Sequence, residues 1–281
     1  MTEEVTLATS HPLFGASLKL SRARSHIDEF STNLKEFLAT EPFKHDPFTY
    51  DAHRGVYKGK ITRATTPPPI LGGIAGDAVH NLRCTFDLIA SGIIIESNRS
   101  DVYFPISKRK DDYKLRGLKT ANKRALDLIE RYQPFSSPDN VDLLKIRNMD
   151  NWDKHRAITT VTILISRYKT SITSDMLVYL TPDNRIARIR LSSPIEGHIT
   201  QKITTTTPQG GRYTPREGRY VAFPPTPHAE IFQPILDFTV ALEGTTDWKE
   251  EEALPALERF YAYTSKALRD FCDIFPEPHT A

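Results

Sequence analysis

Apolar residues recur at helical spacing over much of the chain. Between positions 13 and 37 they are spaced mainly by three, four and seven residues, which predicts one long amphipathic helix that ends before Pro42 and Pro47. After the extended, proline-rich residues 65–69, the pattern predicts a second helix from about Gly76 to Ile95. Similar spacing predicts further helices at about 120–132, 139–156, 227–242 and 250–274.

Other segments are rich in β-branched residues, which are typical of strands. Residues 48–61 contain Gly55 and Gly59 and predict a hairpin. After position 156 the helical pattern changes, and strands are predicted at 157–166, 171–180, 185–191, 197–207 and 219–223. The fold class expected from these elements is α+β, a helical bundle with an inserted antiparallel β-sheet.

The predicted elements divide the chain into three parts. Residues 1–156 form a helical region with a small β-hairpin, and residues 157–225 form the antiparallel insertion. Residues 226–281 form a C-terminal helical pair that packs back on the bundle. A length of 281 residues suits either one large domain or two small ones.

Composition narrows the class of protein. Charged residues make up 26% and hydrophobic residues 39%, which disfavours a disordered chain and a fibrous repeat. The net charge of +2 selects no ligand, but the three parts carry +4, +5 and −7, so an anionic ligand is expected at the first two. No apolar run approaches the roughly 20 residues of a membrane span, and the two cysteines make no disulfide framework, so we expect a cytoplasmic protein with no membrane partner.

The segment GDAVHNLRCTFDLIA, residues 76–90, carries the strongest local signal. At 100° per residue, one helix face within about 120° collects Asp77, His80, Asn81, Cys84 and Asp87, with Arg83 at its edge. Solvent-facing helices usually display Lys and Glu instead. In the functional interpretation His80, Arg83 and Asp87 are catalytic residues and Asn81 helps to bind the substrate. In the structural interpretation Arg83 pairs with Asp87 one turn later and His80 packs as an ordinary surface residue.

A second candidate is the sequence DKHR, residues 153–156, where a predicted helix gives way to a strand. Cationic residues there also suit the helix dipole without any further function. If this segment meets the 76–95 helix in space, His155 is the expected acid and base, and Lys154 and Arg156 are expected to bind an anionic substrate.

Other chemistries find little support. The chain has no P-loop, no dinucleotide fingerprint and no CxxC pair, so no cofactor is expected. Asp77, His80 and Asp87, together with His155, have ligand types that suit a metal ion, but such spacings arise often by chance and no metal is expected. Cys84 has His80 one turn away, although a single helical cysteine is more often a small buried hydrophobe.

Several motifs occur together in one order: the GDAVHNLR segment with Asp87, then Phe104-Pro105-Ile106, then Gln133-Pro134, then DKHR. In this the chain resembles a family of largely uncharacterised bacterial and phage-borne proteins that share Gly-Asp, His-Asn-Leu-Arg and Asp-Lys-His-Arg motifs. The resemblance covers about residues 20–160 and implies a shared fold more than an activity. Relatives commonly have a His after the motif's Asp, whereas this chain has Leu88.

A weaker similarity points to the HEPN superfamily of helical ribonucleases and nucleotide-binding modules. Those proteins place an Arg four to six residues before a His on one helix. Here seven residues separate Arg147 from His155, so the spacing departs from that pattern. The similarity implies metal-independent RNA cleavage, in which a His helps to deprotonate the 2′-hydroxyl and an Arg stabilises the charged phosphorane.

Two functions from different classes follow as hypotheses. The first is an RNA-directed nuclease or nucleotide-processing protein, acting in conflict with phage, with RNA or a nucleotide as its ligand. The second is a non-catalytic binding or assembly module, in which the same polar residues form a structural network between helices. A homodimer is compatible with either hypothesis.

Overall fold

The structure is a computed structural model of the chain, and two compact units make it up. It describes residues 5–45, 49–51, 56–94, 102–115, 117–118, 120–155, 161–169, 177–180, 187–190, 198–203, 220–223, 235–242 and 251–275. The first unit comprises residues 1–31, 72–159 and 254–281, and the second comprises residues 32–71 and 160–253. The predicted α+β class is confirmed, because the described residues contain both helices and antiparallel strands.

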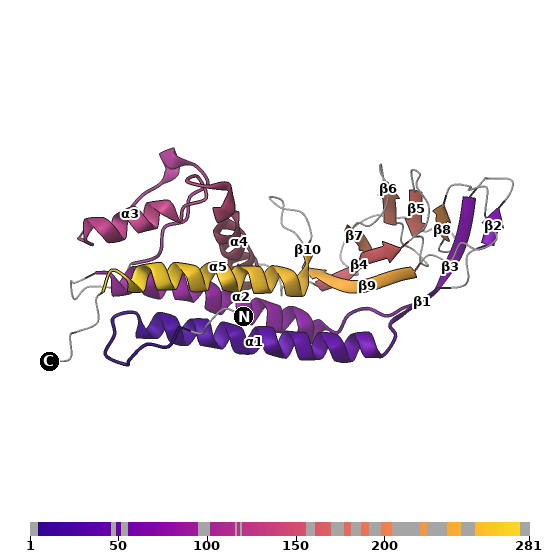
Figure 1. Ribbon diagram of the computed structural model, residues 1–281, viewed down its shortest axis with the longest axis horizontal. Coiled ribbons are helices and arrows are strands. Elements are labelled where there is room, and N and C mark those ends of the chain that lie inside the picture. The colour runs from indigo at the N-terminus through magenta and orange to yellow at the C-terminus, as the bar shows by residue number, and fades with distance from the viewer. Residues whose placement is uncertain are drawn as a thin grey trace. The chain divides into compact units, whose positions relative to one another are not determined.

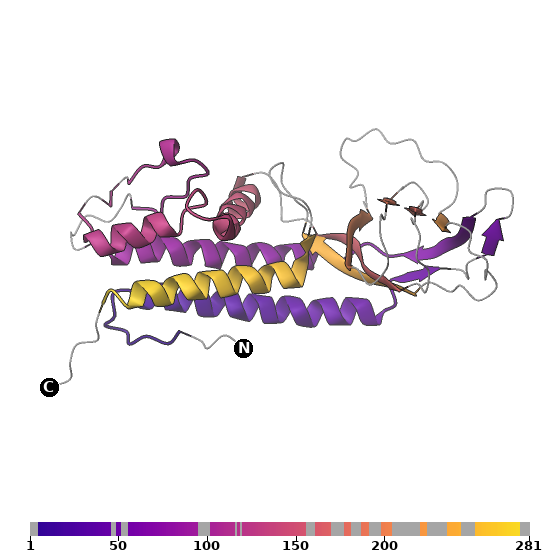
Figure 2. The same cartoon turned by 45° about the horizontal axis from the view of Figure 1, so that its top comes forward.

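The first unit is built from helices that come from both ends of the chain (Figure 1). Its long helices are α1 (Phe14–Ala39), α2 (Pro69–Gly92) and α5 (Ala253–Cys272). The last residues of α1, the first three of α2 and the first of α5 belong to the second unit. Figures 1 and 2 both show these three helices side by side. Shorter helices follow α2 in the chain: η1 (Lys110–Asp112), α3 (Lys123–Arg131), η2 (Pro138–Asn140) and α4 (Val141–His155).

Aromatic side chains fill the centre of this unit. The ring of Phe86 on α2 lies 5.0 Å from that of Phe104 and 6.2 Å from that of Tyr263 on α5. Phe104 also meets Phe271 edge to face, with 6.1 Å between ring centroids. Phe86, Phe104 and Phe271 are at most 1% exposed. The hydrophobic burial of such rings, about 1.5–3 kcal/mol each, is the main force that joins α2 to α5.

Polar side chains tie the shorter helices to α5. The hydroxyl of Tyr132, just after α3, donates to Oδ2 of Asp270 at 2.6 Å. Nε of Arg259 on α5 donates to Oδ2 of Asp142 on α4 at 2.9 Å. Because Asp142 is 6% exposed, this carboxylate needs a charged partner in the fold.

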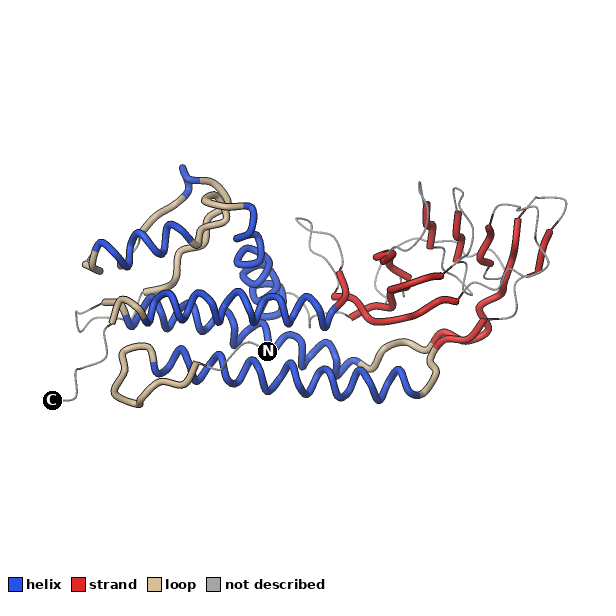
Figure 3. Tube along the Cα trace, in the orientation of Figure 1, coloured by secondary structure: helices blue, strands red, loops and turns tan. Residues whose placement is uncertain are grey.

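The second unit is made of antiparallel strands, drawn red in Figure 3. Strand β3 (Val56–Ala64) pairs with β1 (Phe43–His45), β2 (Thr49–Asp51) and β8 (Tyr220–Phe223). A further sheet has the order β10 (Glu251–Glu252), β9 (Ile235–Leu242), β4 (Val161–Lys169) and β7 (His198–Ile203). Strands β5 (Leu177–Leu180) and β6 (Ala187–Arg190) pair with each other.

Most predicted elements are present. The first helix, the 48–61 hairpin, the 120–132 and 139–156 helices and the strands after position 160 are confirmed within the described residues. Helix α2, however, begins at Pro69, seven residues before its predicted start at Gly76. Proline is well suited to the first turn of a helix. Glycine in this turn disfavours a helix, but the burial of Leu71 and Ile74 stabilises it.

The predicted helix over 227–242 is wrong for the described residues 235–242, which form strand β9. The expected C-terminal helical pair is therefore a strand followed by the single long helix α5. Apolar residues at 236, 238 and 240 alternate with polar Asp237 and Thr239, which is the period of two of a strand. Over only eight residues this pattern is hard to distinguish from helical spacing. Pairing with β4 along the whole of β9 decides the outcome.

Among the described residues, none of the helices combines the length and the apolar character that crossing a membrane would require.

Candidate functional site

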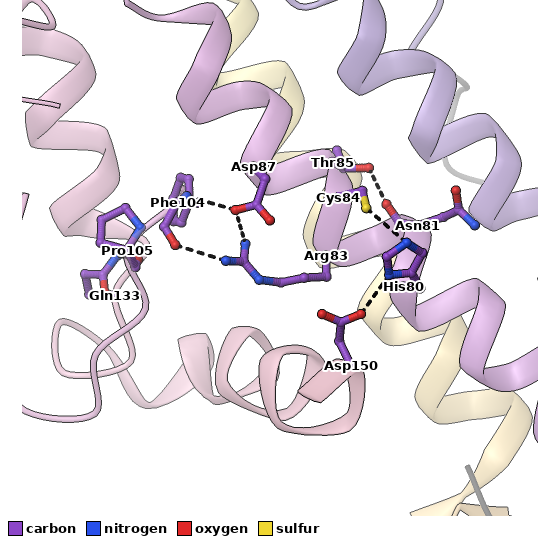
Figure 4. A network of polar contacts seen from close by, with 10 residues as sticks. All are labelled: His80, Asn81, Arg83, Cys84, Thr85, Asp87, Phe104, Pro105, Gln133 and Asp150. Carbon is purple, nitrogen blue, oxygen red and sulfur yellow. Dashed lines mark hydrogen bonds and ion pairs between the residues drawn. The ribbon is translucent and has the colours of Figure 1, made fainter. Parts of the chain in front are cut away.

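The polar residues of α2 form two separate groups of contacts. The first group binds the segment that follows the helix in the chain. We call residues 102–107 the strap; they have no regular secondary structure. Oδ1 of Asp87 accepts a hydrogen bond from the Phe104 amide at 2.9 Å, and Arg83 donates to the Phe104 carbonyl at 3.3 Å (Figure 4). Both backbone polar groups of Phe104 are thus held by side chains of α2.

Side chains from beyond α3 and from α4 hold the rest of the strap. Gln133 donates to the Pro105 carbonyl at 2.7 Å and accepts from the Ser107 amide at 3.0 Å. Arg147 on α4 donates to the Ile106 carbonyl at 2.8 Å. An irregular segment must find partners for its backbone groups outside regular structure, and here three different parts of the helical unit supply them.

Arg83 and Asp87 are largely removed from solvent. Their side chains are 11% and 26% exposed, and Nη1 of Arg83 lies 2.8 Å from Oδ1 of Asp87 as an ion pair whose alignment is not that of a hydrogen bond. The predicted pairing of these two residues is confirmed. With the strap contacts added, their charges are used within the fold, which supports the structural interpretation of both residues.

The second group of contacts on α2 is centred on His80. Its Nδ1 lies 2.8 Å from Oδ1 of Asp150 on α4, and its Nε2 lies 3.4 Å from Sγ of Cys84 (Figure 4). The His80 side chain is 40% exposed, whereas that of Asp150 is 3% exposed. A buried carboxylate therefore holds one nitrogen of an accessible imidazole, while the other nitrogen faces a thiol.

This arrangement sets the chemistry that His80 can perform. With its proton on Nδ1, the ring donates to Asp150, and the lone pair on Nε2 can accept the thiol proton of Cys84. The carboxylate stabilises the imidazolium that forms when Nε2 takes up a proton. Cys84 is thus placed as a nucleophile, His80 as its base and Asp150 as the group that orients the base.

The two segments singled out from the sequence do converge. The carboxylate of Asp153 on α4 lies against α2 at Gly76, so close that a β-carbon at Gly76 would be 2.8 Å from its Oδ1. Asp150, one turn earlier on α4, reaches His80, one turn further along α2. Helix α4 therefore meets α2 along the stretch from Gly76 to His80.

The remaining predicted site residues have different positions. Asn81 is 8% exposed, and its Nδ2 donates to the Asp77 carbonyl at 2.8 Å, one turn earlier on its own helix. The substrate-binding role predicted for Asn81 therefore stays a prediction. His155 is the last residue of α4, and the side chains of Lys154 and His155 and the whole of Arg156 lie outside the described residues.

Two readings of the sequence gain no support from this geometry. Arg147, which carried the similarity to HEPN proteins, donates to the strap and to Oδ1 of its neighbour Asn148. Within the part of the chain that the structure describes, no three His, Cys, Asp or Glu side chains are placed so that they could share a metal ion.

Three residues of these networks are not predicted as site residues by the sequence. Asp150 could have been found, because it lies one turn before Asp153 and so shares its helix face. Gln133 and Arg147 belong to the motifs seen in the sequence, but their role as partners of a distant backbone has no sequence signal, because every residue has the same backbone groups.

Comparison of the chain with models of protein families, with curated protein sequences and with solved structures found no match in any of the three.

Proposed function

We propose that the first unit is a binding or assembly module in which Arg83 and Asp87 have a structural and not a catalytic role, because they hold the strap in place. The observation that carries the proposal is the fixation of Phe104, whose amide is bound by Asp87 and whose carbonyl is bound by Arg83. Phe104 is 1% exposed, while the neighbouring Tyr103 is 63% exposed. The network thus anchors one side of an extended segment and presents the other side to solvent.

The energetics favour such a structural role. A buried backbone group that loses its hydrogen-bond partner costs about 1–3 kcal/mol, and a charged partner increases that value. The strap relies on Arg83, Asp87, Gln133 and Arg147 for backbone contacts. The presence of these charged and amide side chains beside the strap is therefore explained without any reaction.

The experiment compares Arg83→Met and Asp87→Asn with Arg109→Met. Arg109 forms an ion pair with Asp112 at 2.9 Å, but its side chain is 74% exposed, so it is a matched control for loss of an arginine. We expect the free energy of unfolding to fall by about 2–4 kcal/mol for the α2 variants and to stay close to the wild-type value for the control. Limited proteolysis should cut the strap first in the α2 variants.

Two results would contradict this proposal. One is unchanged stability and an uncut strap in Arg83→Met and Asp87→Asn. The other is an RNA-cleaving activity that these variants lose while they keep wild-type unfolding curves, because the two charges would then act on a substrate and not on the strap.

A second candidate is a metal-independent RNA-directed nuclease or nucleotide-processing protein, active in conflict with phage. The observation that favours it is the accessible ring of His80, oriented by the buried Asp150. In this reaction His80 would take the proton of a 2′-hydroxyl, and Lys154, His155 and Arg156 would supply the predicted acid and anion-binding groups. The carboxylate of Asp150 beside the ring weighs against it, because it repels phosphate.

The test incubates mixed RNA with wild type, His80→Gln and His155→Ala, with and without a chelator. Cleavage that survives the chelator and is lost in both histidine variants supports the nuclease. If wild type leaves the RNA intact, the nuclease proposal fails, while cleavage that requires a metal would overturn its metal-independent form.

A further inference from the structure

Once Arg83 and Asp87 are assigned to the strap, a distinct group of reactive side chains remains on the same helix. We propose that Cys84, His80 and Asp150 form a nucleophilic thiol centre that accepts an acyl group from activated acyl compounds such as esters. This inference goes beyond the assembly role and does not depend on it. The hydrogen bonds that hold Phe104, Pro105, Ile106 and Ser107 of the strap come from other side chains than these three.

The first support is geometry. Sγ of Cys84 is 3.4 Å from Nε2 of His80, within the usual range for a thiol and an imidazole, and Nδ1 of the same ring is 2.8 Å from Asp150. The carboxylate and the thiol thus bind opposite nitrogens of one ring, as Figure 4 shows. Two residues four apart on α2 supply the nucleophile and the base, and a second helix supplies the orienting carboxylate.

The second support is the order of exposure. Asp150 is 3% exposed, the ring of His80 is 40% exposed, and Cys84 is partly exposed. The buried carboxylate holds the ring in place through the contact with its Nδ1. A cysteine with a purely structural role is normally buried, whereas Cys84 is partly exposed.

The chain contains a matched reference thiol. Cys272, the only other cysteine in the sequence, lies at the end of α5 and is not part of a disulfide either. Burial, with the neighbouring Asp273 carboxylate, raises the pKa of the Cys272 thiol to about 11. At neutral pH this thiol stays protonated and reacts slowly, so each molecule carries its own control.

The proposed reaction has two balanced steps. Nε2 of His80 takes the thiol proton while Sγ of Cys84 attacks the acyl carbon of the ester, so that an S–C bond forms and the C–O bond to the alcohol breaks. The alcohol leaves with the proton from His80. Water then attacks the thioester with His80 again as base, which releases the carboxylic acid and restores the thiol.

The first experiment needs no variant. Wild-type protein is treated with limiting iodoacetamide at pH 7, and the two cysteine peptides are quantified by mass spectrometry. We expect Cys84 to be alkylated about tenfold faster than Cys272 or more. Equal rates, or faster modification of Cys272, would overturn the proposal, and this result would leave the strap experiment untouched.

The second experiment uses p-nitrophenyl acetate as the acyl donor. Wild type and Cys272→Ser should release p-nitrophenolate and carry an acetyl group on Cys84, whereas Cys84→Ser should carry none. Asp150→Asn should slow the acylation about tenfold or more, because an amide can turn the ring to the wrong tautomer. His80→Gln should slow it about a hundredfold and shift the pH at which alkylation accelerates to higher values.

Circular dichroism of each variant separates chemistry from folding. A folded Asp150→Asn or His80→Gln variant with wild-type acylation would show that Cys84 reacts without help, and the thiol centre would be refuted. An acetyl group found only on lysines or on Cys272 would refute it as well.

Discussion

The carboxylate of Asp153 occupies the space beside α2 that a β-carbon on Gly76 would need. That atom would lie 3.0 Å from Cγ of Asp153 and 2.8 Å from its Oδ1, and the second distance is shorter than real β-carbons show. The glycine of the Gly-Asp motif is thus explained by the approach of α4, whose next turn towards the N-terminus brings Asp150 to His80.

The first prediction concerns this contact. Gly76→Ala should lower the free energy of unfolding by about 1–3 kcal/mol, because the added methyl group displaces Asp153. Gly73→Ala is the control, since nothing lies within 4 Å of its β-carbon position, and it should raise stability by about 0.5–1 kcal/mol through helix propensity. Urea unfolding measures both. In an Asp153→Ala background the penalty of Gly76→Ala should vanish, and a persistent penalty would contradict the assignment.

The second prediction concerns the end of α2. A β-carbon on Gly92 would meet the backbone oxygen of Pro12 at 2.8 Å and Leu13 Cδ2 at 2.6 Å. A backbone oxygen cannot rotate away, so Gly92→Ala should cost about 2 kcal/mol or more in thermal or urea unfolding. Gly15→Ala, which would make ordinary contacts of 3.6 Å with Leu88, should be neutral or stabilising, and equal losses at both positions would argue against this packing.

The third prediction concerns Gln133, which is fully buried. Gln133→Met keeps the size of the side chain but leaves the Pro105 carbonyl and the Ser107 amide without this partner. We expect a loss of about 2–4 kcal/mol. Asp112→Asn, at an exposed ion pair, should change stability by less than about 0.5 kcal/mol. Differential scanning calorimetry compares the two variants, and a small effect of Gln133→Met would show that the strap is held elsewhere.

The fourth prediction concerns two tyrosines whose hydroxyl groups differ in hydrogen bonding. The hydroxyl of Tyr113 is buried without a hydrogen-bond partner among the described residues, whereas that of Tyr132 donates to Asp270 at 2.6 Å. Tyr113→Phe should therefore leave stability unchanged or raise it by up to about 1 kcal/mol, and Tyr132→Phe should lower it by about 1–3 kcal/mol. Thermal unfolding at pH 7 gives both values, and the same sign for both variants would contradict the assignment.

Alkaline pH adds a second measurement on these residues. Burial, with a contribution from the Glu130 carboxylate, raises the pKa of Tyr113 to about 12, and burial raises the pKa of Tyr132 as well. The unfolded chain loses these protons near pH 10, before the folded protein does. Their contribution to stability is complete below pH 10 and falls as the pH rises above it. The contribution of Tyr113 is lost as the pH passes about 12, so Tyr113→Phe should reduce the fall in stability between pH 10 and 12.

Part of the site could be predicted from the sequence. Helical spacing placed His80, Cys84 and Asp87 on one face of α2, and the Arg83 to Asp87 pairing follows from their separation of four residues. The partners from other elements could not be predicted, because the contacts of Asp150 with His80 and of Gln133 with the strap join residues far apart in the sequence. For the same reason β9 was mistaken for a helix, since its partner β4 lies more than sixty residues earlier.

The sequence by itself determined the local properties of this protein: its α+β class, the long helices α1, α2 and α5, and a helix face with unusual polar residues. Only the tertiary structure decided what those residues do. It assigned Arg83 and Asp87 to the strap and left His80 between a buried carboxylate and a thiol. The physical reason is that periodicity sets which way a side chain faces on its own helix, while its charge or proton acquires a role only from the group that packing brings against it.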